Sequence, residues 1–188
     1  MADKLKDFIG GFTAAIELYN RAGKIGAFIE SVCLAASIIE ASLRMGLVLK
    51  HQINMQSSDI LDELLFQGEE DKVTVERKIY DRALHEGVIN QKLFSTLEEL
   101  YKDRNRVVHR YIISELTTEE VLSIAIKYDK AIQDVSSAVE VLENEQIQRG
   151  IGITRSDIVE FDMKEYFDLA SNKHGKRGFV NKLRDNDV

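Results

Sequence analysis

The sequence contains no proline and no tryptophan, and it has a single cysteine among its 188 residues. Because proline interrupts helices and punctuates loops, its absence favours a nearly all-helical chain with short connections. The lone Cys33 cannot form an internal disulfide, which predicts a reducing, cytoplasmic location. With one cysteine and four scattered histidines, no spacing typical of a metal site occurs, so we expect neither a metal ion nor another cofactor.

The sequence also has fewer basic than acidic residues, 25 against 32, which gives a net charge of −7. This balance argues against a broad nucleic-acid-coating surface and restricts any such contact to a local patch. The N-terminus carries acids and no uninterrupted apolar core, so it does not read as a signal peptide. The longest apolar stretch, residues 25–49, contains Glu30, Glu40 and Arg44, which are expensive in lipid. We therefore expect a buried helix of a soluble protein and no membrane contact.

Apolar residues recur every three or four positions along most of the chain, and this spacing predicts helices. The predicted helices cover residues 3–20, 25–50, a short segment from a cap at Ser57 or Ser58 to Phe66, residues 73–86, a helix capped by Asn90, and residues 117–149. The helix at 25–50 is the most apolar and is expected at the centre, with Glu40 paired to Arg44 four positions on.

The predicted fold class is therefore all-α, an up-and-down helical bundle. Glycines at 150 and 152 indicate a boundary. Residues 1–150 are expected to form the bundle, and residues 151–188 a C-terminal extension made of one helix and a polar tail.

Basic residues concentrate in the segment Tyr101–Tyr111, at the end of the helix that Asn90 caps. Within it a single acid, Asp103, is outnumbered by Lys102, Arg104, Arg106 and Arg110. A basic cluster on an acidic protein predicts a phosphate-bearing partner. The alternative is an ordinary helix end, where arginine and histidine side chains satisfy the last carbonyl groups.

Helical periodicity divides this segment between two faces. One face, predicted to point inward or toward an interface, carries Leu97, Leu100, Tyr101, Arg104, Val108 and Tyr111. An arginine on an inward face needs a partner anion, a hydrogen-bond network or a wet cavity. Asn105 and His109 lie four positions apart on an adjacent face, where the amide could fix the imidazole tautomer or bind a phosphate oxygen.

The spacing of Arg104, His109 and Tyr111 resembles the RX4HXY signature of HepT-type toxins in the HEPN superfamily. Asn105 is the polar residue expected directly after the arginine, and the motif lies on a predicted helix of an all-helical chain, as that family requires. The resemblance covers about residues 25–145 and does not extend to the tail. It implies a HEPN-type bundle that acts as a homodimeric, metal-independent endoribonuclease of a toxin–antitoxin or phage-defence system.

The resemblance further implies that Arg104, Asn105, His109 and Tyr111 form the catalytic site. RNA carries its own nucleophile, the 2′-hydroxyl, so attack on the adjacent phosphate needs only proton transfer and positive charge. His109 suits the proton transfers and Arg104 suits the charged phosphorane. Because one histidine cannot easily serve as acid and base in the same step, a two-fold dimer with two motif helices in one cleft is favoured.

Some assignments stay open at this stage. Tyr111 is either a site residue, which in toxins of this type a partner nucleotidyltransferase antitoxin can silence, or an ordinary core or interface tyrosine. Lys102, Arg106 and Arg110 are expected to bind flanking phosphates of the RNA or simply to solvate the helix. The competing functions are a non-catalytic HEPN-like module that binds RNA or a nucleotide or has a regulatory role, and a purely structural helical dimer.

Overall fold

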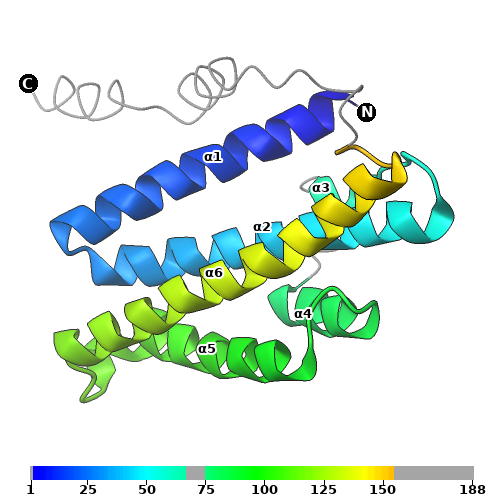
Figure 1. The fold of residues 1–188 in the computed structure, drawn as a ribbon. Coiled ribbons are helices and arrows are strands. Elements are labelled where there is room, and N and C mark those ends of the chain that lie inside the picture. Colours follow the sequence, from blue (N-terminus) through cyan, green and yellow to red (C-terminus); the bar gives the residue numbers. More distant parts are fainter. Residues whose placement is uncertain (1, 67–74, 155–188) are drawn as a thin grey trace, which may run out of the picture.

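The structure is a computed structural model that describes residues 2–66 and 75–154, and every regular element in these two ranges is a helix. The prediction of an all-α chain is thus confirmed. The elements are α1 (Ala2–Ile25), α2 (Phe28–Met55), α3 (Asp62–Leu65), α4 (Glu76–His85), α5 (Gln91–Arg110), the 3₁₀ turn η1 (Tyr111–Ile113) and α6 (Thr118–Arg149) (Figure 1). Beyond residue 154, the predicted C-terminal extension lies outside the described residues.

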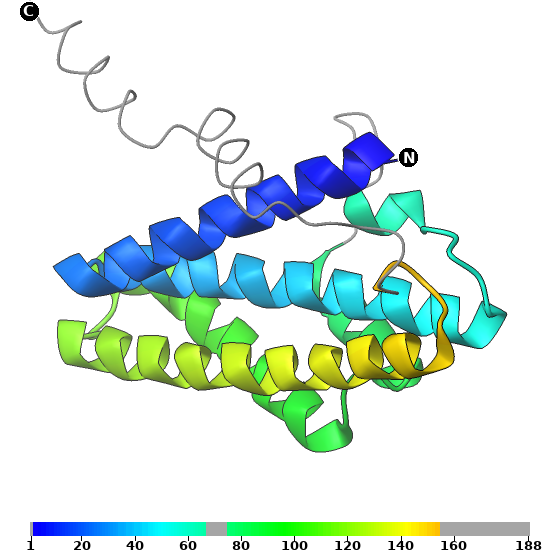
Figure 2. The same cartoon turned by 45° about the horizontal axis from the view of Figure 1, so that its top comes forward.

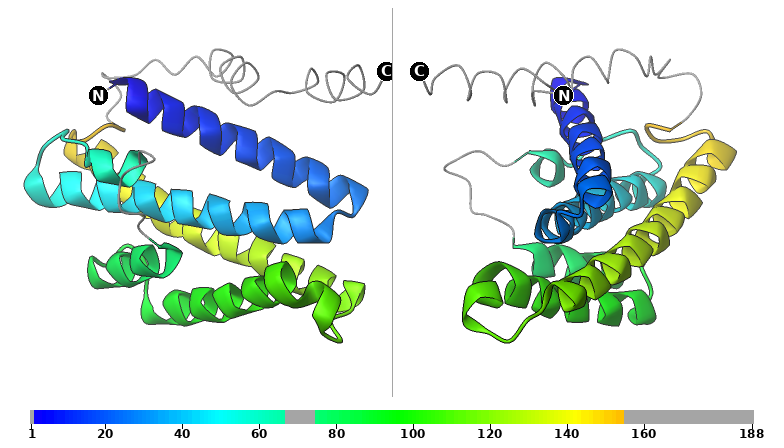
Figure 3. Two further views of the ribbon diagram at one scale, coloured as in Figure 1. Left: turned by 180° about the vertical axis from the view of Figure 1, so that it is seen from behind. Right: turned by 90° about the vertical axis from the view of Figure 1, so that its left-hand side faces the viewer.

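Helix α2 lies at the centre of the bundle, as predicted, and contacts α1, α3, α4, α5 and α6. Helices α1 and α3 cover one side of it, and α4 and α5 cover the opposite side (Figure 3). Helix α6 runs alongside α2 over most of its length (Figure 2). Helices α1 and α5 point one way along the bundle, while α2 and α6 point the other way (Figure 1).

The apolar side chains of α2 explain its central position. Val32, Ala35, Ile39, Leu43 and Leu47 of this helix have no exposed surface, and burial of such side chains is the main driving force for folding. Among the described helices, α2 is long and apolar enough to cross a membrane. However, 61% of its most apolar 18-residue stretch is buried inside the protein. Burial in the bundle therefore accounts for its apolar composition.

Both ends of α6 follow signals that are visible in the sequence. The Thr117 hydroxyl accepts a hydrogen bond from the Glu120 backbone N–H at 3.2 Å, and the Glu120 carboxylate accepts one from the Thr117 N–H at 2.8 Å. This is the predicted capping box. Gly150 ends the helix in the left-handed conformation, with the Ile151 N–H donating to the Gln146 carbonyl at 3.1 Å.

Two predicted boundaries differ from the structure. Helix α1 continues to Ile25 rather than ending near residue 20, because its terminal turn closes at Gly26, which has φ +73°. Neither Ser57 nor Ser58 caps α3. Its N-cap is Leu61, without a side-chain hydrogen bond. The Ser57 hydroxyl instead accepts from the Asp59 N–H at 3.2 Å, so it stabilises a turn ahead of the helix.

A buried pair of glutamines links α2 to the end of α6. Gln52 and Gln146 have no exposed surface, and the Gln146 amide donates to the Gln52 side-chain oxygen at 2.9 Å. The Ile153 N–H donates to the same Gln52 oxygen at 3.2 Å, and the Thr154 hydroxyl donates to the Gln146 oxygen at 2.8 Å. Residues 151–154 are thus hydrogen-bonded to the bundle that precedes them.

Candidate functional site

The predicted motif lies on the last two turns of α5 and on the residue that follows them. The Asn90 side chain accepts a hydrogen bond from the Leu93 N–H at 2.9 Å, which confirms that Asn90 caps this helix. The helix ends at Arg110, so Arg104 and His109 are helical, whereas Tyr111 begins the 3₁₀ turn η1. The α5 scaffold therefore fixes the directions in which the motif side chains leave the backbone.

The inward face of α5 is defined by Leu97, Leu100 and Val107, which are at most 2% exposed. Val108, predicted to face inward or toward an interface, is 42% exposed and therefore does not face the core of its own chain. At 100° per residue, position 107 returns to within about 20° of Leu100, whereas position 108 is turned about 80° away. Arg104 stays close to the inward face, as predicted, and is half-buried.

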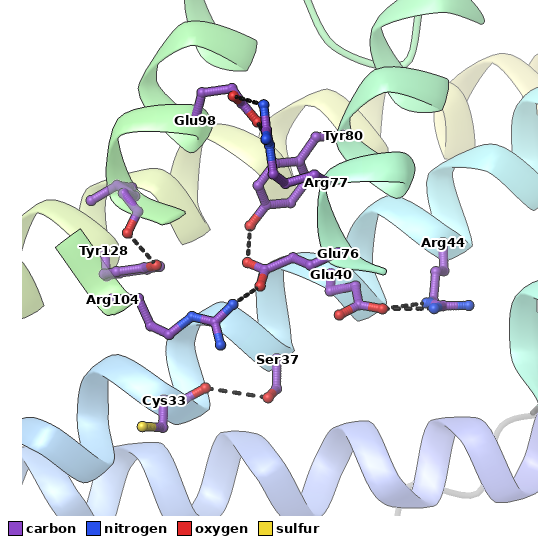
Figure 4. A network of polar contacts seen from close by, with 11 residues as sticks. Cys33, Ser37, Glu40, Arg44, Glu76, Arg77, Tyr80, Glu98, Arg104 and Tyr128 are labelled. Carbon is purple, nitrogen blue, oxygen red and sulfur yellow. Dashed lines mark hydrogen bonds and ion pairs between the residues drawn. The ribbon is translucent and has the colours of Figure 1, made fainter. Parts of the chain in front are cut away.

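Arg104 has an anionic partner within its own chain. Its Nη2 donates to the Oε2 atom of Glu76, the first residue of α4, in an ion pair where the two side chains are 24% and 10% exposed (Figure 4). The guanidinium also lies 5.0 Å from the ring centroid of Tyr101, a cation–π distance. No other described residue accepts from Arg104, and its buried Nε has no hydrogen-bond partner.

Glu76 is in turn fixed by a hydrogen bond from Tyr80 to its second carboxylate oxygen. The Tyr80 hydroxyl donates to the Oε1 atom of Glu76, and the tyrosine has no exposed surface. Burial raises the pKa of Glu76 above the ordinary 4.5, while the Tyr80 hydrogen bond and the Arg104 charge act in the opposite direction. Burial and the neighbouring Glu76 charge also raise the pKa of Tyr80. The phenol therefore stays protonated and serves Glu76 as a donor.

A polar strip of α2 lies next to this network. The Arg44 side chain donates to Glu40 Oε1 at 2.6 Å and 2.9 Å, which confirms the predicted pair, and to the Leu64 carbonyl at 3.2 Å. Earlier on the same strip, Ser37 is exposed and Cys33 is half-buried. Burial raises the pKa of the Cys33 thiol, and the Arg104 charge lowers it. The arginine is thus close enough to α2 to act on its side chains.

Two hollows lie near α2 and α5. A pocket of about 300 Å³ at the far end of the α2 strip is lined by Phe8, Ser37, Glu40, Ala41, Arg44 and Leu64–Phe66. A larger hollow of about 520 Å³ lies between the start of α5 and the second half of α6, and no motif residue lines it. Neither hollow places Arg104 and His109 in one pocket of a single chain.

The other basic residues of the motif lie on the outer face of α5. His109, Lys102, Arg106 and Arg110 are exposed. Arg106 pairs with Asp103 at 3.1 Å. Within the described ranges, neither His109 nor Asn105 forms a hydrogen bond or an ion pair. Tyr111 is half-buried, with its hydroxyl 3.3 Å from the Thr118 hydroxyl. The four predicted catalytic residues thus occupy different sides of one helix end.

Sequence reasoning anticipated a partner for Arg104 but not its identity. Glu76 lies 28 positions away and Tyr80 lies one turn beyond it, so no local spacing connects them to the motif. The available signal was the expected need of an inward arginine for a partner anion, a hydrogen-bond network or a wet cavity, and the structure shows the first of these, supplied by Glu76. Among the residues described, no cluster of histidine, cysteine and acidic side chains is arranged to hold a metal ion. Comparisons of the chain with protein-family models, with curated proteins and with solved structures find no match.

Proposed function

We propose that this chain is a HEPN-type, metal-independent endoribonuclease of a toxin–antitoxin or phage-defence system, acting in the cytoplasm as a homodimer. The observation that carries the proposal is the exposed His109 at the end of α5, free of partners among the described residues and flanked by exposed Arg106 and Arg110. An imidazole can act as general base or general acid toward a bound RNA. The neighbouring cations can bind the phosphates on either side.

The proposed chemistry is attack of an RNA 2′-hydroxyl on the adjacent phosphate. A base must take the proton of that hydroxyl, an acid must protonate the leaving 5′-oxygen, and a cation must stabilise the phosphorane. His109 supplies the proton transfers, each worth about 10²–10⁴-fold in rate. Arg104 supplies the positive charge, because a guanidinium is a permanent cation and only Nη2 of Arg104 donates a hydrogen bond to another described residue. The products are a 2′,3′-cyclic phosphate and a free 5′-hydroxyl.

A dimer is part of the proposal because Arg104 and His109 lie on different sides of α5 in one chain, and neither of the two hollows described above contains both. Exposed apolar side chains beside His109 support self-association at this end of the bundle: Val108 is 42% exposed, Ile112 is 94% exposed and Ile113 is 81% exposed. Apolar surface of this kind next to a polar site is typical of an interface. A two-fold axis there would bring two copies of the motif together.

The dimer is tested by sedimentation of wild type, Ile112→Asp and Ile147→Asp. Ile147 is a matched control, because it is also an exposed isoleucine, at 54%, but lies near the opposite end of α6. We expect the change at Ile112 to weaken self-association and the change at Ile147 to leave it intact. A wild-type chain that stays monomeric at high concentration contradicts the composite site.

Catalysis is tested with RNA in the presence of EDTA. We expect wild type to cleave and to leave a 2′,3′-cyclic phosphate, and His109→Ala and Arg104→Ala each to lose cleavage while remaining folded. His85→Ala is the control, since His85 is an exposed histidine in the last turn of α4. Full activity of His109→Ala contradicts the proposal.

One observation favours the alternative of a non-catalytic HEPN-like module that binds RNA or a nucleotide. Because Glu76 neutralises Arg104 in the single chain, the inner arginine of the motif contributes little net positive charge. In that case binding depends on Lys102, Arg106 and Arg110, it weakens with salt, and no product forms even at high protein concentration.

A cognate nucleotidyltransferase is the partner that the toxin proposal includes, and Tyr111 is the residue it would modify. The tyrosine is half-buried at the surface end of α5, and its hydroxyl has Thr118 as a neighbour. Mass spectrometry of the chain after co-expression with such an enzyme is the test. Addition of a nucleotide at another residue contradicts this role for Tyr111.

A further inference from the structure

Arg104 is held by its own protein in a way that leaves part of its guanidinium available. Glu76 takes only Nη2, and the Tyr101 ring covers one side of the group at 5.0 Å. Among the described residues nothing accepts from Nη1, which points away from Glu76 toward the part of α2 that carries Cys33 and Ser37 (Figure 4). Two contacts thus fix the guanidinium plane, and among the described residues Nε and Nη1 have no acceptor.

The open donors are the unusual feature of this network. Buried donors are nearly always paired, and an unpaired one calls for an explanation. The Nε atom of Arg104 is buried and has no partner in the described part of the chain. An oxyanion that entered beside α2 could supply acceptors to the side of the guanidinium that Glu76 does not use.

Glu76 is itself rigidly held, which indicates a supporting role rather than a mobile gate. Its second oxygen accepts from Tyr80, whose side chain has no exposed surface and which sits on the same helix one turn later. The carboxylate therefore cannot turn away from Arg104 without breaking a buried hydrogen bond. Burial already disfavours its charged form, as the raised pKa of Glu76 shows, so the fold retains a carboxylate in an unfavourable place.

From these contacts we propose that Glu76, anchored by Tyr80, is a positioning residue that orients Arg104 toward the scissile phosphate of the RNA. The inference rests on the proposed ribonuclease function and adds to it a role for two residues outside the motif. Glu76 does not touch the substrate in this role. It acts through the direction in which Arg104 presents its free donors, and misplacing such a group by about 1 Å is worth about 10²-fold in rate.

A purely structural ion pair is the competing explanation, and the protein contains a matched control for it. Arg77 donates to Glu98 at 2.7 Å and 2.8 Å, and this pair joins α4 to α5 just as Glu76 joins α4 to Arg104. Arg77 lies over the Tyr101 ring at 5.8 Å, and its anionic partner is Glu98, whereas that of Arg104 is Glu76. Loss of either pair removes a tie between α4 and α5, a weaker one at the exposed Arg77, and the melting temperatures report the size of each loss, whereas orientation of Arg104 is lost only at Glu76.

The test compares Glu76→Gln, Glu76→Asp, Tyr80→Phe and Glu98→Gln with wild type by kcat, KM and melting temperature on one RNA. For Glu76→Gln we expect kcat to fall about 10–100-fold with KM changed less than about threefold, because the outer cations bind RNA while Arg104 acts on the transition state. Tyr80→Phe should lower kcat by a smaller factor. Glu76→Asp, which keeps the charge on a shorter side chain, should recover part of the rate, and Glu98→Gln should match wild type.

Provided that Glu76→Gln folds, three results overturn the inference. One is a Glu76→Gln enzyme with kcat within about twofold of an active wild type. Another is a loss of kcat that Glu98→Gln shares, which indicates a structural tie. The third is a gain in kcat, which indicates that Glu76 blocks Arg104. If Glu76→Gln fails to fold, an unchanged kcat in Tyr80→Phe and Glu76→Asp overturns it equally. A wild type that cleaves no RNA instead overturns the proposed function, and with it the positioning role of Glu76.

Discussion

A double-mutant cycle on Glu76 and Arg104 separates the attraction within this pair from the penalty of burying it. The side chains are 10% and 24% exposed, so the pair lies between a surface pair, worth about 0–1 kcal/mol, and a fully buried one, whose disruption costs about 3–5 kcal/mol. We therefore expect a coupling energy of about 1–3 kcal/mol in the cycle formed by Glu76→Gln, Arg104→Gln and the double variant.

The two single variants should differ, because burial acts on them with opposite signs. Removing the charge of Glu76 loses the attraction but also removes the burial penalty that raises its pKa, so Glu76→Gln should destabilise by less than about 1 kcal/mol. Arg104→Gln leaves a buried carboxylate without its cation and should cost about 2–3 kcal/mol. The double variant should be more stable than Arg104→Gln.

Urea denaturation of the four proteins at pH 7 and constant ionic strength gives the required free energies. A second cycle on Arg77 and Glu98 is the control, and its coupling should be smaller because Arg77 lies on the surface. Equal coupling in the two cycles, or a Glu76→Gln variant less stable than Arg104→Gln, refutes the reasoning.

Three further predictions follow from named contacts. Because the pKa of Glu76 is raised, its contribution to stability is present below the ordinary value of 4.5 and is lost as pH rises through the higher folded value, so the deficit of Arg104→Gln relative to wild type should shrink in acid unfolding curves taken below pH 4.5. Arg104→Gln should slow iodoacetamide labelling of Cys33 near neutral pH by about 2–5-fold, because the lost charge no longer lowers the pKa of the thiol. Gly152→Ala should cost about 2–4 kcal/mol in urea denaturation, since its Cβ would overlap the buried glutamine of α6, whereas Gly87→Ala, at a similar positive φ but in open space, should cost only about 1–2 kcal/mol.

Local patterns in the sequence predicted the elements that depend on local interactions. The Asn90 cap, the Thr117 capping box and the Glu40–Arg44 pair all involve residues three or four positions apart, and all three are present. Burial of α2 followed from its composition, because a helix this apolar has to be covered by its neighbours.

Predictions of helix starts and side-chain partners failed, or could not be made, where contacts between residues far apart in the sequence determine the structure. The short helix α3 does not start at Ser57 or Ser58, because the preceding turn is tied to α2 by the Gln52 amide, which donates to the Asp59 carbonyl at 3.0 Å. Val107 rather than Val108 packs into the core, because consecutive residues point in directions about 100° apart around the helix axis. Glu76 could be anticipated only as an unnamed acid, since its contact with Arg104 spans 28 positions.

The order in which the helices leave the ribosome gives the buried glutamines a further consequence. Gln52 belongs to α2, yet its partner Gln146 is 94 residues later and the Ile153 amide is 101 residues later. At synthesis rates of about 5–20 residues per second, the most apolar helix of the chain waits roughly 5–20 s for the helix that covers it. During that interval α1, α3, α4 and α5 can cover α2 but α6 cannot, so the nascent chain is most prone to aggregate before the last residues of α6 emerge. A chaperone that binds apolar segments should therefore associate with nascent chains that end within α5 and release those that extend past Thr154.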